Sequence, residues 1–71
     1  DASEAEKACE AFQRALRFQP DWIPALRDLG WAFRRANRPA DAIRTWERGV
    51  RLYPQAAIWL IWIATTQMEQ G

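Results

Sequence analysis

The sequence contains no histidine, one cysteine and one lysine, and these shortages exclude several kinds of site. Without histidine, the chain lacks the commonest metal ligand and the usual acid–base group near neutral pH. Cys9 has no second cysteine with which to form an internal disulfide. The three glycines are spread along the chain and form no phosphate-binding loop. We therefore expect no catalytic residues, no metal site and no cofactor, and we predict that the chain is not an enzyme.

Long apolar runs and an excess of one charge are also missing. The longest apolar run, residues 58–64, is far shorter than the roughly 20 residues that span a bilayer, so no membrane partner is expected. Ten basic and nine acidic residues leave a net charge of +1, which gives no bulk attraction to nucleic acid. Because the chain begins with Asp1, we expect a segment of a longer cytoplasmic protein whose targeting signals can be missing.

An internal repeat of 34 residues organises what is present. Sliding the sequence by this distance pairs small residues with small ones, large with large and proline with proline. The pairs are Ala8 with Ala42, Phe12 with Trp46, Ala15 with Gly49, Pro20 with Pro54, Leu26 with Leu60, Leu29 with Ile63, and Gly30 with Ala64. A repeat of this length is typical of helical solenoids, in which each unit needs its neighbours to complete the core.

Local signals divide the repeat into helices. Pro20 and Pro54 each end a helix, because the residue before a proline avoids helical angles. Asp21 is predicted to cap the second helix, Asn37 to end it in a left-handed conformation, and Pro39 to open the third. The predicted fold is all-α, an α-solenoid of antiparallel helix pairs. Its four helices are expected at about 3–18, 22–37, 39–53 and 56–70.

The spacing of these residues resembles the tetratricopeptide repeat, with its pattern W-x2-L-G-x2-Y, then A-x3-F, then P. The matching residues are Leu26, Leu29, Gly30, Phe33, Ala42, Trp46 and Pro54. On this resemblance, residues 23–56 form one complete repeat. Residues 1–22 form the second half of a preceding repeat, and residues 57–71 the first half of a following one. The resemblance implies a right-handed superhelix that acts as a non-catalytic protein-interaction module.

The resemblance also implies which residues face a concave groove. These are Pro24, Arg27, Asp28, Trp31, Arg34 and Arg35 in the second helix, and Ile58, Ile61, Trp62, Thr65 and Met68 in the last. A carboxylate clamp of Lys and Asn, found in some family members, is not supported. Its positions here hold Arg27, Trp31, Ile58 and Trp62. The implied partner is a peptide or a protein surface.

Arg27, Trp31, Arg34 and Arg38 follow one another at helical spacing and admit three interpretations. They form a solvated face, or they bind an acidic or aromatic segment through Arg forks and cation–π contacts. RNA binding is a minor alternative, because basic residues interleaved with an aromatic suit stacking and phosphate contacts.

The last helix predicts self-association. Its residues 58–64 are all apolar, whereas a helix on one neighbour buries only a stripe. Leu60, Ile63 and Ala64 are expected to fill that stripe. The residues expected to stay partly uncovered are Ile58, Trp59, Ile61 and Trp62. They would pack against neighbouring repeats of the parent protein, or against a second copy in a two-fold homodimer.

Overall fold

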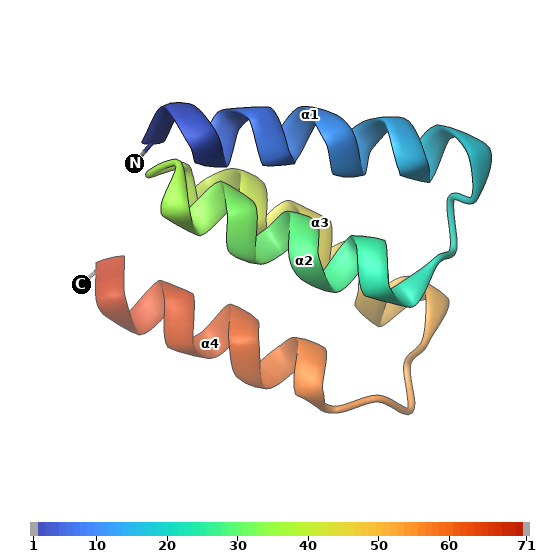
Figure 1. Ribbon diagram of the computed structural model, residues 1–71. Coiled ribbons are helices and arrows are strands. Elements are labelled where there is room, and N and C mark those ends of the chain that lie inside the picture. Colours follow the sequence, from blue (N-terminus) through green and yellow to red (C-terminus); the bar gives the residue numbers. More distant parts are fainter. Residues whose placement is uncertain (1, 71) are drawn as a thin grey trace.

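The computed structural model describes residues 2–70, and within that range the chain forms four consecutive antiparallel helices (Figure 1). The helices are α1 (Ala2–Phe18), α2 (Ile23–Arg35), α3 (Pro39–Leu52) and α4 (Ile58–Gln70). Each helix packs closely against the next helix along the chain. The result is a thin slab with Cα extents of 35 × 33 × 13 Å. The predicted all-α helical repeat is therefore confirmed.

Proline and the turns fix most of the helix ends. Pro39 is the first residue of α3 and Pro24 lies in the first turn of α2, where neither residue's missing amide donor is needed. The prediction that Asp21 caps α2 is wrong, because the N-cap is Trp22 and no side chain in the described range 2–70 caps that end. The Asp21 carbonyl instead accepts a hydrogen bond from the Tyr53 hydroxyl, which ties the first turn to the end of α3.

Asn37 ends α2 as the sequence predicts, with a positive φ of 62°. The amide of Asn37 donates to the Arg34 carbonyl, and the amide of Arg38 donates to the Phe33 carbonyl at 2.8 Å. These two bonds form a Schellman motif, which satisfies carbonyls that the helix end would leave unpaired. A short turn into α3 follows directly.

The positive φ of Asn37 gives a first testable prediction. In this conformation the Cβ atom lies too close to the following carbonyl oxygen, and asparagine tolerates this better than alanine because its short polar side chain can hydrogen-bond locally. Asn37→Ala is therefore expected to lower the free energy of unfolding by about 1 kcal/mol, whereas Asn37→Gly should leave it nearly unchanged. Urea denaturation followed by circular dichroism measures both. Equal midpoints for the alanine and glycine variants would contradict the left-handed assignment.

The core consists of large rings seated on glycines of the neighbouring helix. Trp46 of α3 is fully buried over Gly30 of α2, where an added Cβ would lie 2.1 Å from the ring nitrogen. Trp59 of α4 lies over Gly49 of α3 in the same way, with an added Cβ 2.5 Å from its ring. Because glycine has no side chain, the helices can approach closely enough for each ring to fill the gap.

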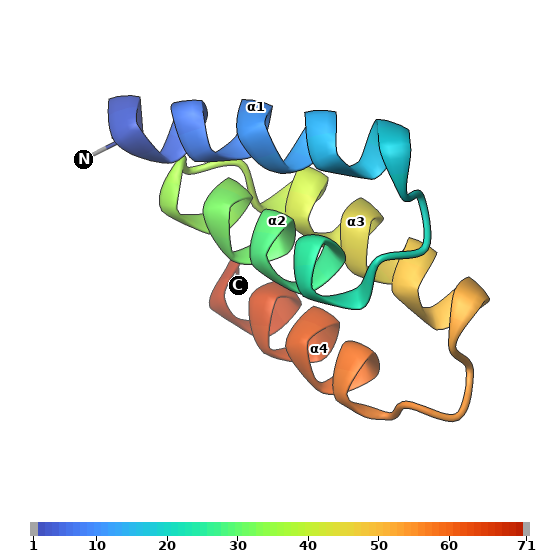
Figure 2. The same cartoon turned by 45° about the vertical axis from the view of Figure 1, so that its right-hand side comes forward.

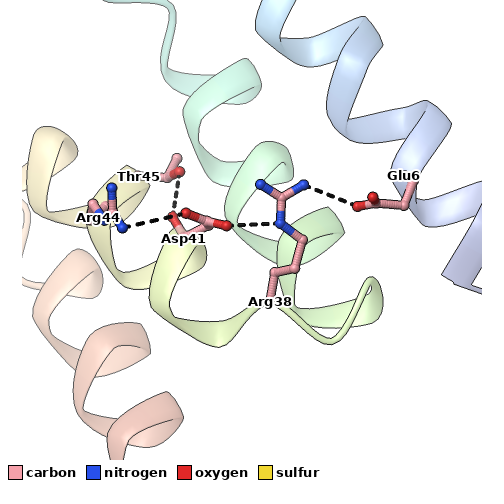
Figure 3. Close-up of polar contacts among 5 residues, drawn as sticks. All are labelled: Glu6, Arg38, Asp41, Arg44 and Thr45. Carbon is pink, nitrogen blue, oxygen red and sulfur yellow. Dashed lines mark hydrogen bonds and ion pairs between the residues drawn. The ribbon is translucent and has the colours of Figure 1, made fainter.

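A polar cluster around Arg38 joins three segments at one end of the slab (Figure 3). Its guanidinium donates to Glu6 of α1 at 3.1 Å and to Asp41 of α3 at 2.8 Å. These two hydrogen bonds raise the pKa of Arg38, with the Glu6 bond as the larger cause. The guanidinium also lies 4.7 Å from the ring centre of Phe33. Of the four residues Arg27, Trp31, Arg34 and Arg38, Arg38 thus already contacts side chains of α1 and α3.

Candidate functional site

A cleft of about 550 Å³ lies between α1 and α2. Small and aromatic side chains form its floor, and charged side chains surround them. The lining residues are Glu4, Ala5, Ala8, Phe12, Asp28, Trp31, Ala32 and Arg35. Three of the predicted groove residues, Asp28, Trp31 and Arg35, therefore lie together on this cleft. The contribution of α1 was missed by the sequence argument, although the spacing of Ala8 and Phe12 carried the signal.

Four tryptophans form a continuous aromatic cluster behind the cleft. Trp31 meets Trp46 edge to face at 4.9 Å between ring centres, and meets Trp62 at 5.6 Å. Trp59 meets Trp62 nearly perpendicularly at 5.5 Å. Edge-to-face pairs of this kind each add roughly 0.5–1.5 kcal/mol beyond their area burial. Trp31 and Trp62 are only half-buried, so this rigid cluster also reaches the surface.

The arginines of the predicted groove differ in whether they already form ion pairs. Arg27 forms an ion pair with the adjacent Asp28 at 2.9 Å, and this hydrogen bond raises the pKa of Arg27. Arg34 forms an ion pair with Glu69 of α4 and lies 5.2 Å from the centre of the Trp31 ring. Between Ala2 and Gln70, Arg35 forms no ion pair. Arg35 is therefore the most available cation on the cleft.

The apolar last helix lies one residue out of the predicted register. Trp59 is only 1% exposed and Ile63 is also buried, whereas Leu60 is 55% exposed and Ala64 is exposed. The predictions that Leu60 and Ala64 fill the buried stripe, and that Trp59 is uncovered, are therefore wrong. The buried residue of α4 that corresponds to Leu26 is Trp59, which follows Pro54 by five residues, whereas Leu26 follows Pro20 by six. The repeat distance at α4 is thus 33 residues.

This shift changes which residues of α4 correspond to the cleft residues of α2. At a distance of 33, the counterparts of Asp28, Trp31 and Arg35 are Ile61, Ala64 and Met68. Ile61 is 56% exposed and Met68 80%. Ile58 and Thr65 are also exposed, and Trp62 is half-buried within the tryptophan cluster. Ile61 and Met68 therefore keep their predicted surface position, while the binding role of every residue in this set stays a prediction.

Residues 2–70 were also compared with the requirements of a reactive thiol, a metal site and a membrane span. Cys9 is buried in the core, as expected of an unpaired cysteine, and burial raises the pKa of its thiol. No cluster of three potential metal-ligating side chains occurs among residues 2–70. Over the same residues, no helix is both long enough and apolar enough to cross a membrane.

Comparison with known families agrees with the geometry. The sequence profile described as "Tetratricopeptide repeat" matches residues 23–66, more than half of the chain. The chain belongs to the tetratricopeptide repeat family. Comparison with curated proteins and with solved structures found no match.

Membership of the family indicates the broad role of the chain. Tetratricopeptide repeats generally mediate protein–protein interactions and are not catalytic units. The matched residues begin at the start of α2 and extend through most of α4. They therefore include the cleft residues of α2 and, in α4, the exposed Ile58, Leu60 and Ile61 but not Met68. The predicted repeat boundaries at 22/23 and 56/57 stay predictions.

Proposed function

We propose that this tetratricopeptide repeat chain binds a peptide or protein segment in the cleft between α1 and α2. The observation that carries the proposal is the composition of that cleft. Its floor of Ala8, Phe12 and Ala32 is apolar, the half-buried Trp31 adds an aromatic wall, and Arg35 supplies a cation that forms no ion pair within residues 2–70. Interfaces are enriched in aromatic and arginine anchors of this kind.

The described lining of the cleft holds the cation Arg35 and two carboxylates, Glu4 and Asp28, of which Asp28 is paired with Arg27. Arg27 and Arg34 already have carboxylate partners, so an acidic ligand must displace Asp28 or Glu69 to reach them. Arg35 needs no such displacement. We therefore expect a segment that places an apolar side chain on the alanine floor and a single carboxylate beside Arg35, because Glu4 and Asp28 on the same cleft would repel further negative charge. This refines the acidic-segment hypothesis for Arg27, Trp31 and Arg34.

A charge reversal at Arg35 tests this binding mode. Peptides are first selected from a phage-displayed random library on the folded protein, and their affinities are then measured by fluorescence anisotropy. Arg35→Glu is expected to weaken the selected peptides by about tenfold or more, since each 1.4 kcal/mol changes affinity tenfold. Arg14→Glu makes the same charge change on α1, outside the cleft lining, and should leave affinity unchanged. Failure to enrich any peptide, or equal losses in both variants, would contradict the proposal.

The exposed side of α4 favours a second candidate function, self-association. Leu60, Ile61 and Met68 each expose more than half of an apolar side chain, and Ile58 exposes 43%. Large exposed apolar patches in folded proteins are typical of interaction surfaces. Trp59 contributes nothing to such a surface because it is buried against Gly49. The contact surface of the predicted two-fold dimer would therefore consist of Ile58, Ile61 and the half-buried Trp62, together with Leu60 and Met68.

A further inference from the structure

We propose that a second pocket, of about 300 Å³ and bounded by α1, α2 and α3, binds the phosphoryl group of a phosphorylated residue in a partner protein. In Figures 1 and 2, α3 lies behind α2, and α1 runs above both. The pocket shares no lining residue with the cleft between α1 and α2. It is therefore a site additional to the proposed peptide cleft.

Three arginines are the charged residues of this pocket. Arg17 comes from α1, and Arg44 and Arg48 come from α3. Of the residues between 2 and 70 that line the pocket, none carries a carboxylate. The cleft, by contrast, holds one arginine and two carboxylates. Like charges gathered without a counter-charge repel one another, so an anion that enters this pocket would relieve the repulsion.

Helical spacing brings the long polar side chains of the pocket together as two pairs. Gln13 and Arg17 are four residues apart on α1, and Arg44 and Arg48 are four residues apart on α3. Residues at this spacing lie on the same side of a helix, where two like charges destabilise it. The Arg44–Arg48 pair therefore has a cost that helix formation does not explain and that anion binding would offset.

Arg44 is only loosely held within the protein. Its Nη2 atom lies 3.9 Å from Oδ1 of Asp41, which is beyond hydrogen-bond distance. The other carboxylate oxygen of Asp41 accepts a hydrogen bond from Arg38 at 2.8 Å (Figure 3). The Arg44 side chain is also 78% exposed. Its guanidinium can therefore turn toward an anion in the pocket without breaking a hydrogen bond among residues 2–70.

Arg48 is oriented by the backbone. Its Nη2 atom donates to the carbonyl of Pro20 at 2.8 Å, which places the guanidinium beside the turn that follows α1. A guanidinium has five N–H donors, so Arg48 keeps donors beyond the one that Pro20 accepts. Arg17 lies in the last turn of α1, and within residues 2–70 it forms no ion pair. One oriented arginine and two adaptable ones thus line the same pocket.

The number of donors favours a phosphoryl group over a single carboxylate. A phosphorylated side chain carries a charge of about −1.5 to −2 near neutral pH and has three acceptor oxygens, whereas a carboxylate has one charge and two oxygens. Arginine forks match the geometry of phosphate oxygens, and arginine clusters are a recurring means of binding phosphorylated residues. The floor of Leu16, Leu29 and Phe33 is buried and apolar, which lowers the local dielectric and strengthens each charge contact.

The same pocket is less suited to RNA. Single-stranded RNA is bound by stacking bases on accessible aromatic rings as well as by phosphate contacts. Phe33 is the aromatic residue of the described lining, and at 4% exposure its ring offers no face for stacking. Tetratricopeptide repeats generally mediate protein–protein interactions, which favours a protein as the source of the phosphoryl group.

Phosphoserine peptides test the site directly. A peptide library with phosphoserine fixed at its centre is presented to the folded protein, in parallel with the same library carrying serine. Only the phosphoserine library should be enriched. The affinity of an enriched peptide, labelled with fluorescein, is then measured by fluorescence anisotropy, with inorganic phosphate and oligouridylate as competitors. Both competitors should bind about tenfold or more weakly than the peptide, because phosphate lacks flanking residues and the pocket offers no stacking surface.

Matched arginine variants locate the phosphoryl group. Arg17→Gln and Arg44→Gln each remove one charge from the pocket and are expected to weaken binding of the phosphoserine peptide by about tenfold. Arg14→Gln and Arg51→Gln make the same change on the same two helices, outside the pocket lining, and should leave the affinity nearly unchanged. All four residues are exposed, and circular dichroism melts should show that every variant is folded.

Several results would overturn the proposal. Equal enrichment of the serine and phosphoserine libraries would exclude phosphoryl recognition, and equal losses in all four variants would indicate diffuse attraction to a positive surface. Competition by inorganic phosphate as strong as that of the peptide would identify a free-anion site, and tighter binding of oligouridylate would identify an RNA site. A larger loss with Arg35→Glu than with either pocket variant would place the phosphoryl group in the cleft. Failure of the cleft peptides leaves this test unaffected, because the two sites share no lining residue.

Discussion

Trp46→Ala is expected to lower the free energy of unfolding by about 3–5 kcal/mol, the range for removing a buried large ring. The Trp46 side chain is fully buried, lies against the backbone of Gly30 and contacts both Trp31 and Trp62. A 71-residue domain at about 0.05–0.15 kcal/mol per residue has roughly 4–11 kcal/mol in total. The variant should therefore melt far below the wild type, and at the lower end it should be largely unfolded.

The glycine beneath the ring provides a matched test of the same contact. A Cβ on Gly30 would lie 2.1 Å from Nε1 of Trp46, so Gly30→Ala must push the ring or the helix aside and should destabilise by about 1–3 kcal/mol. Reducing the ring in the same chain relieves that clash. The double variant with Trp46→Phe should therefore lose less stability than the sum of the two single changes.

Trp22 supplies the control for these measurements. It is 46% exposed at the start of α2, and Trp22→Ala removes a ring of the same size from the surface. More than half of Trp22 is buried, so Trp22→Ala should lower the free energy of unfolding, but by clearly less than Trp46→Ala because part of the ring is already in water. Thermal melts in which Trp46→Ala and Trp22→Ala shift equally would mean that the 34-residue register of α2 and α3 is misplaced.

The sequence was sufficient to predict which sides of α2 and α3 are buried, because both helices are amphipathic and bounded by strong signals. Pro39 opens α3 and Asn37 closes α2, so each helix has a fixed start or end. Gly30 and Trp46 then match in size across the pair. Where polar residues separate the apolar ones, the buried side of a helix can be read from spacing alone.

The register of α4 could not be read in the same way. Residues 58–64 are all apolar, so every side of the first two turns satisfies a hydrophobic stripe. What decides the register is the contact between Trp59 and Gly49, which depends on the length of the preceding link. The ion pair between Arg34 and Glu69 joins residues 35 positions apart and leaves no pattern in the sequence. Which residues of α4 are exposed could therefore be determined only once the helices were placed together.

Substitutions at the neighbouring residues Trp59 and Leu60 distinguish the 33-residue register of α4 from the 34-residue register. Trp59→Glu places a carboxylate in a site that is 1% exposed, against Gly49 and Trp62. Burying an unpaired charge and losing the ring together should cost several kcal/mol, so α4 is expected to detach. Leu60→Glu changes a side chain that is 55% exposed, and its expected cost is about 0.5 kcal/mol or less.

A third variant separates the loss of the ring from the burial of charge. The indole nitrogen of Trp59 is buried without a hydrogen-bond partner, so Trp59→Phe removes an unsatisfied donor while it keeps an aromatic ring over Gly49. Trp59→Phe should therefore stay much closer to the wild type than Trp59→Glu does. Urea denaturation with circular dichroism measures all three variants. If Leu60→Glu proves the most destabilising of them, α4 packs in the 34-residue register after all, and the surface assigned to Leu60, Ile61 and Met68 belongs to the core.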